Sequence, residues 1–108
     1  QKQQIKRLQQ IAGLQLDLRL NDLHAAARAR QESLDRIAGL NMPPRGDLPP
    51  IAAAQADILY QRWADARRAE INQTLARQTA EWLEAQSRAR RAFGQTQAMN
   101  ALHEKIGK

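Results

Sequence analysis

The feature that most constrains this chain is a single proline-dense break, NMPPRGDLPP, at 41–50. It contains all four prolines of the 108 residues, and such a segment cannot continue a helix. Gly39 suits the left-handed position that ends many helices, and Asp47 suits a helix N-cap. We therefore expect one domain with a helix over about 2–38, a Pro-rich loop over 39–48 and a second helix over about 49–105.

The composition on either side of the break favours helix. The chain has twenty Ala, fourteen Gln, thirteen Leu and thirteen Arg, but no Val, and aromatic residues make up only 4%. Residues that form helices are abundant, whereas the β-branched and aromatic residues typical of sheets are scarce. We predict an all-α fold, a long antiparallel two-helix coiled-coil hairpin that buries a seam instead of a large globular core.

One stretch, LQLDLRL at 14–20, alternates leucine with polar residues as a half-buried strand would. A strand needs a partner, and no other stretch offers one. As a helix, it carries one apolar set that can face the second helix: Leu16, Leu20 and Leu23. A second apolar set lies on nearly the opposite side: Ile11, Leu14 and Leu18. We expect this second set either to bind a partner, which includes a second copy of the chain, or to widen the seam.

Apolar positions in the second helix alternate in steps of four and three, as in a coiled-coil seam. These positions are Ile71, Leu75, Gln78, Trp82, Ala85, Ala89, Ala92, Thr96, Met99, His103 and Ile106. The first helix repeats the pattern at Leu16, Leu20, Leu23, Ala27, Arg30, Leu34 and Ile37, with Ile5, Leu8 and Ala12 upstream. Before Ile71 the seam is expected to change phase and follow Leu59, Trp63 and Ala66. With a tight loop, facing residues would have numbers that sum to about 91.

The net charge of +6 and the pI near 10.8 favour acidic partners. The expected pairing gathers six cations at the open end of the hairpin: Lys2, Lys6, Arg7, Arg88, Arg90 and Arg91. We interpret this cluster as a docking patch for an acidic surface. The alternative is a solvated face that Glu81 and Glu84 balance.

The second helix is also the longer one, so the expected pairing leaves its C-terminal part without a partner helix. This tail carries four large apolar residues: Phe93, Met99, Leu102 and Ile106. Either residues before Gln1 are missing, or another protein packs against the tail.

Chemistry-bearing motifs are not found in the sequence. There is no cysteine, no HExxH, no glycine-rich phosphate loop and no Ser/His/Asp set, so we predict no enzyme, no catalytic residues, no cofactor and no metal. Nucleic acid is a disfavoured partner because interleaved aromatic residues are lacking. Arg45-Gly46-Asp47 matches an adhesion tripeptide, which we interpret as a turn. Without an apolar run long enough to span a bilayer or a charged-then-apolar leader, we expect a cytoplasmic protein with no membrane span.

The second helix, ILYQRWADARRAEINQTLARQTAEWLEAQSRARRAFGQTQAMNALHEK, resembles the long second helix of the FliJ/YscO family. These are small stalk proteins of flagellar and virulence type III secretion. The likeness lies in length, in the antiparallel two-helix plan, in Ala/Gln/Arg richness and in an arginine cluster that leads to an aromatic residue: Arg88, Arg90, Arg91 and Phe93. It covers most of the chain.

The resemblance implies a non-catalytic stalk or adaptor of a type III protein export apparatus. Family members resemble the central stalk of rotary ATPases, insert their paired termini into the hexameric export ATPase, contact the export gate and escort export chaperones. The six cations would then mark the ring-inserting end. Two other functions stay open: a coiled-coil interaction protein unrelated to secretion, homodimeric through Leu14 and Leu18, and a basic nucleic-acid-binding hairpin.

Overall fold

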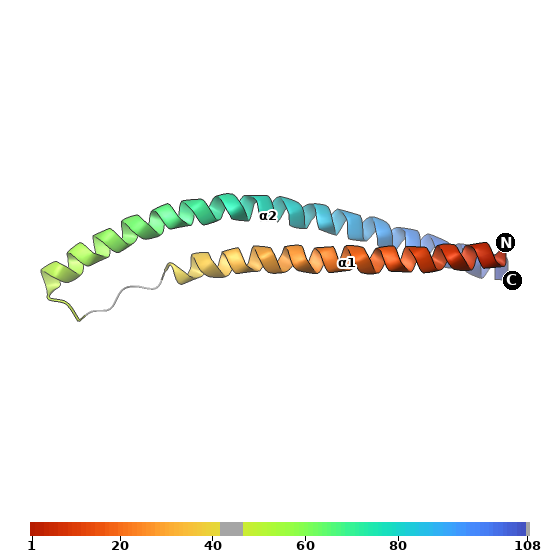
Figure 1. The fold of residues 1–108 in the computed structure, drawn as a ribbon, viewed down its shortest axis with the longest axis horizontal. Coiled ribbons are helices and arrows are strands. Elements are labelled where there is room, and N and C mark those ends of the chain that lie inside the picture. The colour runs from red at the N-terminus through yellow and green to blue at the C-terminus, as the bar shows by residue number, and fades with distance from the viewer. Residues whose placement is uncertain (42–46, 108) are drawn as a thin grey trace. The chain divides into compact units, whose positions relative to one another are not determined.

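The computed structural model describes residues 1–41 and 47–107, which form two long helices. Helix α1 comprises Lys2–Gly39 and helix α2 comprises Pro50–Gly107 (Figure 1). The described part of the chain contains no strand, and the two helices pair antiparallel. The predicted all-α antiparallel hairpin is therefore confirmed, LQLDLRL included. Arg45 and Gly46 of the tripeptide lie outside the described residues.

Helix α1 ends without the left-handed glycine that the sequence suggested. None of the described glycines has a positive φ angle, and Gly39 is the last helical residue. Instead, the backbone N–H groups of Leu40 and Asn41 each donate to a carbonyl three residues earlier, at 3.1 Å. Such bonds tighten the final turn and satisfy carbonyls that the helix end would otherwise leave free.

Helix α2 begins with a proline, which suits a first turn because its missing N–H has no intrahelical partner there. The first residue is Pro50, and the carbonyl of Pro49 accepts the Ala53 N–H at 2.7 Å. Asp47 lies three residues before the helix, so its expected role as N-cap is wrong.

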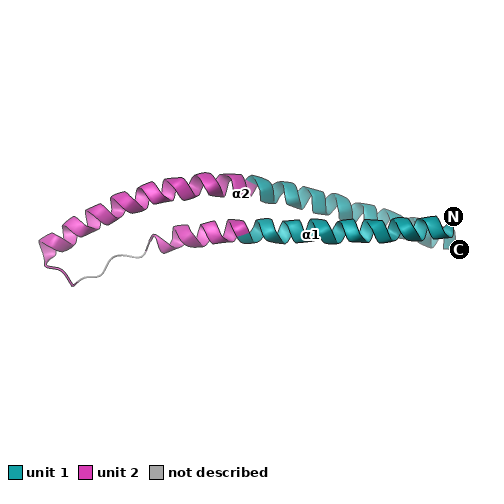
Figure 2. Ribbon diagram, in the orientation of Figure 1, with its two compact units in different colours: residues 1–28, 80–108 teal, residues 29–79 magenta. Residues whose placement is uncertain are grey.

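The helices meet in two compact units (Figure 2). Unit 1 combines residues 1–28 of α1 with residues 80–108 of the C-terminal part of the chain. Unit 2 is formed by residues 29–79. Each unit contains its own segment of the seam.

Hydrogen bonds between the helices establish the pairing register. In unit 1, the Gln9 side chain donates to Asn100 at 2.8 Å, and the Thr96 hydroxyl donates to the Ala12 carbonyl at 3.3 Å. In unit 2, the Ser33 hydroxyl donates to Gln78. The numbers in these pairs sum to 108–111, so the expected sum of about 91 is wrong. The difference of about 18 residues corresponds to about five helical turns.

The physical reason for this register lies in the polar members of the seam. Ser33 is only 2% exposed, and its hydroxyl finds an acceptor in Gln78, while Arg30 Nε donates to Thr79 at 3.1 Å. In the expected register, Ser33 would face Ile58, and a buried hydroxyl without a partner destabilises the fold. The loop does not prevent the offset, because the ten residues between Gly39 and Pro50 can span roughly 33–36 Å when extended.

The predicted seam from Ile71 onward is confirmed, since every member is buried or partly buried. Before Ile71, the expected members Leu59, Trp63 and Ala66 are exposed, Trp63 by 56%. The seam instead passes through Tyr60 and the fully buried Ala64. The prediction that Leu59, Trp63 and Ala66 belong to the seam is therefore wrong.

The small side chain of Ala64 explains this correction. Ala64 forms a core cluster with Leu40 and Ile71, and the Tyr60 hydroxyl donates to the Leu40 carbonyl at 3.2 Å. Ala64 lies seven residues before Ile71, so the heptad continues without the expected change of phase. An alanine allows the end of α1 to approach α2 where a tryptophan would hold it away.

Candidate interaction surface

Small side chains form the α2 half of the seam in unit 1. Ala85, Ala89 and Ala92 are all buried, and they face a leucine-rich part of α1. Alanines permit a close approach of two helices but cover little of the larger side chains beside them. Grooves therefore flank the seam of unit 1.

The first of these, the leucine groove, has a volume of about 520 Å³. Its lining consists of Leu16, Leu20 and Leu23 from α1 and Gln86, Ala89, Arg90 and Phe93 from α2. Phe93 is 53% exposed, and Leu20 is 37% exposed although it belongs to the seam. The predicted seam leucines thus also line a groove, which sequence spacing did not reveal.

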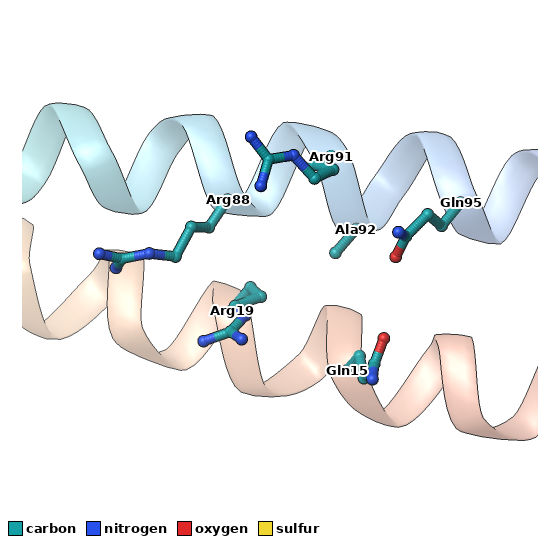
Figure 3. Close-up of a pocket in the computed structure, with 6 residues that line it drawn as sticks. All are labelled: Gln15, Arg19, Arg88, Arg91, Ala92 and Gln95. Atoms are coloured by element: carbon teal, nitrogen blue, oxygen red, sulfur yellow. The ribbon is translucent and has the colours of Figure 1, made fainter.

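The second, the arginine groove, has a volume of about 360 Å³. Gln15 and Arg19 line it from α1, and Arg88, Arg91, Ala92 and Gln95 line it from α2 (Figure 3). Arg88 pairs with Glu84 at 3.2 Å and Arg19 pairs with Asp22 at 3.5 Å, each within one helix and with about half of the side chain exposed. Exposed pairs of this kind contribute little to stability, so both arginines can exchange partners. Arg91 forms no ion pair with any residue that the structure describes.

A third, the methionine groove, has a volume of about 320 Å³. It is lined by Leu8, Ile11, Ala12, Gln15, Gln95, Ala98 and Met99. Gln15 and Gln95 line both this groove and the arginine groove, and Figure 3 shows one of them on each helix. The two grooves are therefore adjoining parts of one face.

The predicted outer apolar face of α1 is confirmed. Leu14 and Leu18 are 69% and 53% exposed, more than any of the three leucines on the seam side. Ile11, at 51%, connects this outer face to the methionine groove.

The prediction that the six cations gather at one end of the hairpin is wrong. In the observed register, Lys2, Lys6 and Arg7 lie beside the last two turns of α2. The arginines at 88, 90 and 91 lie roughly 16–28 Å further along the axis at 1.5 Å per residue. This separation exceeds the screening length of about 8 Å in physiological salt, so the two groups do not act as one patch. Arg90 also lines a different groove from Arg88 and Arg91.

The prediction that the C-terminal part of α2 lacks a partner helix is wrong as well. Because α1 accompanies α2 to its end, Met99 and Ile106 are partly buried against it, and Leu102 is 39% exposed. Phe93 is the one member of this set that stays largely exposed. The segment that extends past α1 is the beginning of α2, in unit 2, where four large apolar side chains are exposed: Ile51, Ile58, Leu59 and Trp63.

Sequence reasoning missed Arg19 as a member of the surface. Its position could have been found from spacing, since Leu8, Ile11, Gln15 and Arg19 recur at steps of three or four and share one helix face. What the spacing could not reveal was that Arg88 and Arg91 lie opposite, because that depends on the register.

The structure offers no sign of a metal centre, as the described residues contain no group of three or more His, Asp or Glu side chains able to hold an ion. Among the helices of the described part, none is long and apolar enough to span a bilayer.

Comparison of the chain with models of protein families, with curated proteins and with solved structures gave no match.

Proposed function

We propose that this chain is a non-catalytic, cytoplasmic stalk or adaptor that binds protein partners through unit 1. The fold is a hairpin of two long helices, and a single observation carries the proposal: large apolar side chains line grooves that the hairpin leaves open. Exposed apolar patches of this kind are typical of interaction sites. The likeness to the FliJ/YscO family suggests which partners to test, namely the hexameric ATPase of a type III export apparatus, the export gate and the export chaperones.

Charge supports the choice of unit 1 as the binding unit. It holds ten Lys and Arg residues against five Asp and Glu, whereas unit 2 holds seven against six. Nearly all of the net charge of +6 therefore belongs to the half of the chain with the grooves. An acidic partner would be attracted to this half, and the attraction would weaken as salt rises.

The test is binding of the purified chain to the export ATPase of the same genome, with the association rate and the ATPase rate measured together. We expect reversal of Arg88, Arg90 and Arg91 to glutamate to slow association by about tenfold or more, because charge complementarity acts mainly on the on-rate. The matched control reverses three exposed arginines outside the grooves: Arg28, Arg62 and Arg77. It makes the same change in net charge and should slow association far less.

A wild-type chain that fails to bind the ATPase at low salt would contradict the stalk function. A coiled-coil interaction protein unrelated to secretion would then be the better description, because the exposed grooves would still need a protein partner. Equal slowing by the two triple variants would show that net charge alone, and not the groove, attracts the partner.

A further inference from the structure

The arginine groove and the methionine groove together form one polarised face. Four residues from each helix define it, at the same steps of three, four and four: Leu8, Ile11, Gln15 and Arg19 from α1, and Arg88, Arg91, Gln95 and Met99 from α2. Each set spans twelve residues, and the eleven steps between the first and the last cover about 16 Å of helix. Because the helices are antiparallel, the apolar residues of both sets meet at one end of the face and the arginines meet at the other.

We propose that this face binds one amphipathic helix of an acidic partner protein. The apolar side chains of the partner helix contact Leu8, Ile11 and Met99. Its carboxylates, two turns further along, contact Arg19 and Arg91. This inference rests on the proposed function as a protein-binding hairpin and specifies which kind of partner segment the hairpin takes.

The shape of the face favours a helix as the occupant. A groove between two packed helices accepts the side-chain ridge of a third, and three turns are enough to reach from Met99 to Arg88. On such a ridge, residues two turns apart point the same way, so one helix can present apolar groups to one end and carboxylates to the other. The shared middle of the face, Gln15 and Gln95, is neutral and tolerates either kind of side chain.

The charges favour a different protein over a second copy of this chain. Unit 1 carries twice as many cations as anions, so two copies that meet through this face would bring like charges together. Arg91 has no ion-pair partner in the described structure, and the partners of Arg19 and Arg88 are exposed neighbours on their own helices. An acidic helix would supply carboxylates to Arg19 and Arg91.

The probe is a labelled helical peptide of about eighteen residues in an alanine-rich host, long enough for five turns. It carries leucine at its fourth and eighth positions and glutamate at its twelfth and fifteenth, which places all four on one face. A control peptide of the same composition places the leucines and glutamates on opposite faces. Binding to the full chain is followed by fluorescence anisotropy at low and at moderate salt, and we expect only the first peptide to bind.

Two pairs of variants locate the site. R91E should weaken peptide binding about tenfold, whereas R28E, which reverses an exposed arginine outside the grooves, should change it less than about twofold. I11Q should weaken binding to a similar extent, whereas L83Q should not, although Leu83 is about as exposed as Ile11. Circular dichroism of each variant verifies that the helices are intact.

Three results would overturn the proposal that this polarised face binds an acidic helix. They are equal effects of the two variants within either pair, equal binding of the two peptides, and no binding of either peptide. If the export ATPase nevertheless bound the chain, the proposed function would stand and only this assignment would fail. Sedimentation of the chain alone measures whether it forms a dimer. A dimer that I11Q dissociates and L83Q does not would assign the face to a second copy and overturn the proposal.

Discussion

Ser33 provides a quantitative test of the helix register. Its side chain is 2% exposed, and its hydroxyl donates to Gln78 across the seam of unit 2. The substitution Ser33→Ala removes this donor and leaves the Gln78 oxygen partly buried without it. A net hydrogen bond of this kind contributes about 1 kcal/mol, and an unsatisfied buried group costs about 1–3 kcal/mol. The expected loss in the free energy of unfolding is therefore about 1–2 kcal/mol.

A matched control separates the hydrogen bond from helix propensity. Alanine is a better helix former than serine by about 0.5 kcal/mol, a gain that partly offsets the loss at Ser33. Ser87 is exposed on α2, so Ser87→Ala measures this gain alone. We expect Ser33→Ala to be less stable than Ser87→Ala by about 1–2 kcal/mol in urea unfolding followed by circular dichroism.

A double-mutant cycle makes the test specific to the pair. Ser33→Ala and Gln78→Ala, measured singly and together, should give a coupling energy of about 1 kcal/mol because each substitution removes the same bond. A coupling energy below about 0.3 kcal/mol would refute the register, since residues far apart are additive. The pair Arg30 and Thr79 lies nearby on the same seam and is left unchanged in all four proteins.

Three further outcomes are expected in the same unfolding assay. Leu16→Ala should destabilise the chain by about 1–3 kcal/mol, which is below the usual range for a core leucine because Leu16 is only partly buried. Leu14→Gln should be nearly neutral because Leu14 is 69% exposed. Equal losses of stability in the two variants would contradict the conclusion that Leu16, and not Leu14, faces α2. Ala64→Leu should cost about 1–3 kcal/mol through overpacking at a fully buried site, and Ala66→Leu should change stability by less than about 0.5 kcal/mol because Ala66 is exposed. Far-ultraviolet circular dichroism should show helix with no substantial strand content.

The helices and most of the seam could be predicted because their signals are local and repetitive. Proline density determines where helices stop, and heptad spacing determines which side of each helix is apolar. Trp63, one of the three positions wrongly assigned to the seam, shows where this reasoning fails. Pattern analysis favours the largest apolar residue as a seam member, whereas close helix approach requires the small Ala64 one position later.

The register could not be predicted from the same signals. Apolar seam positions recur about every 3.5 residues, so a shift by any whole number of these steps again brings apolar residues together. The difference of about 18 residues corresponds to about five such steps, so apolar contacts alone do not select one pairing. The selection depends on a few polar seam residues that must meet suitable partners: Arg30 and Ser33 on α1, Gln78 and Thr79 on α2. The wrong register also made the prediction of the candidate surface wrong, because a different pairing places Arg88 and Arg91 opposite different residues of α1. Arg19 and the polarised face could emerge only once the pairing was known.

The alanine seam connects the fold of unit 1 to its proposed function. Full burial of a leucine or phenylalanine side chain stabilises a protein by about 1.5–3 kcal/mol. Leu20 and Phe93 contribute much less than this because both side chains are partly exposed. Ala89, which lines the same groove, is too small to cover either one. A larger residue at the seam would cover more apolar surface within the chain but would also hold the helices apart and fill the grooves. The open grooves are therefore a direct consequence of close helix packing, and a partner helix placed in them would recover the burial that the hairpin alone leaves unused.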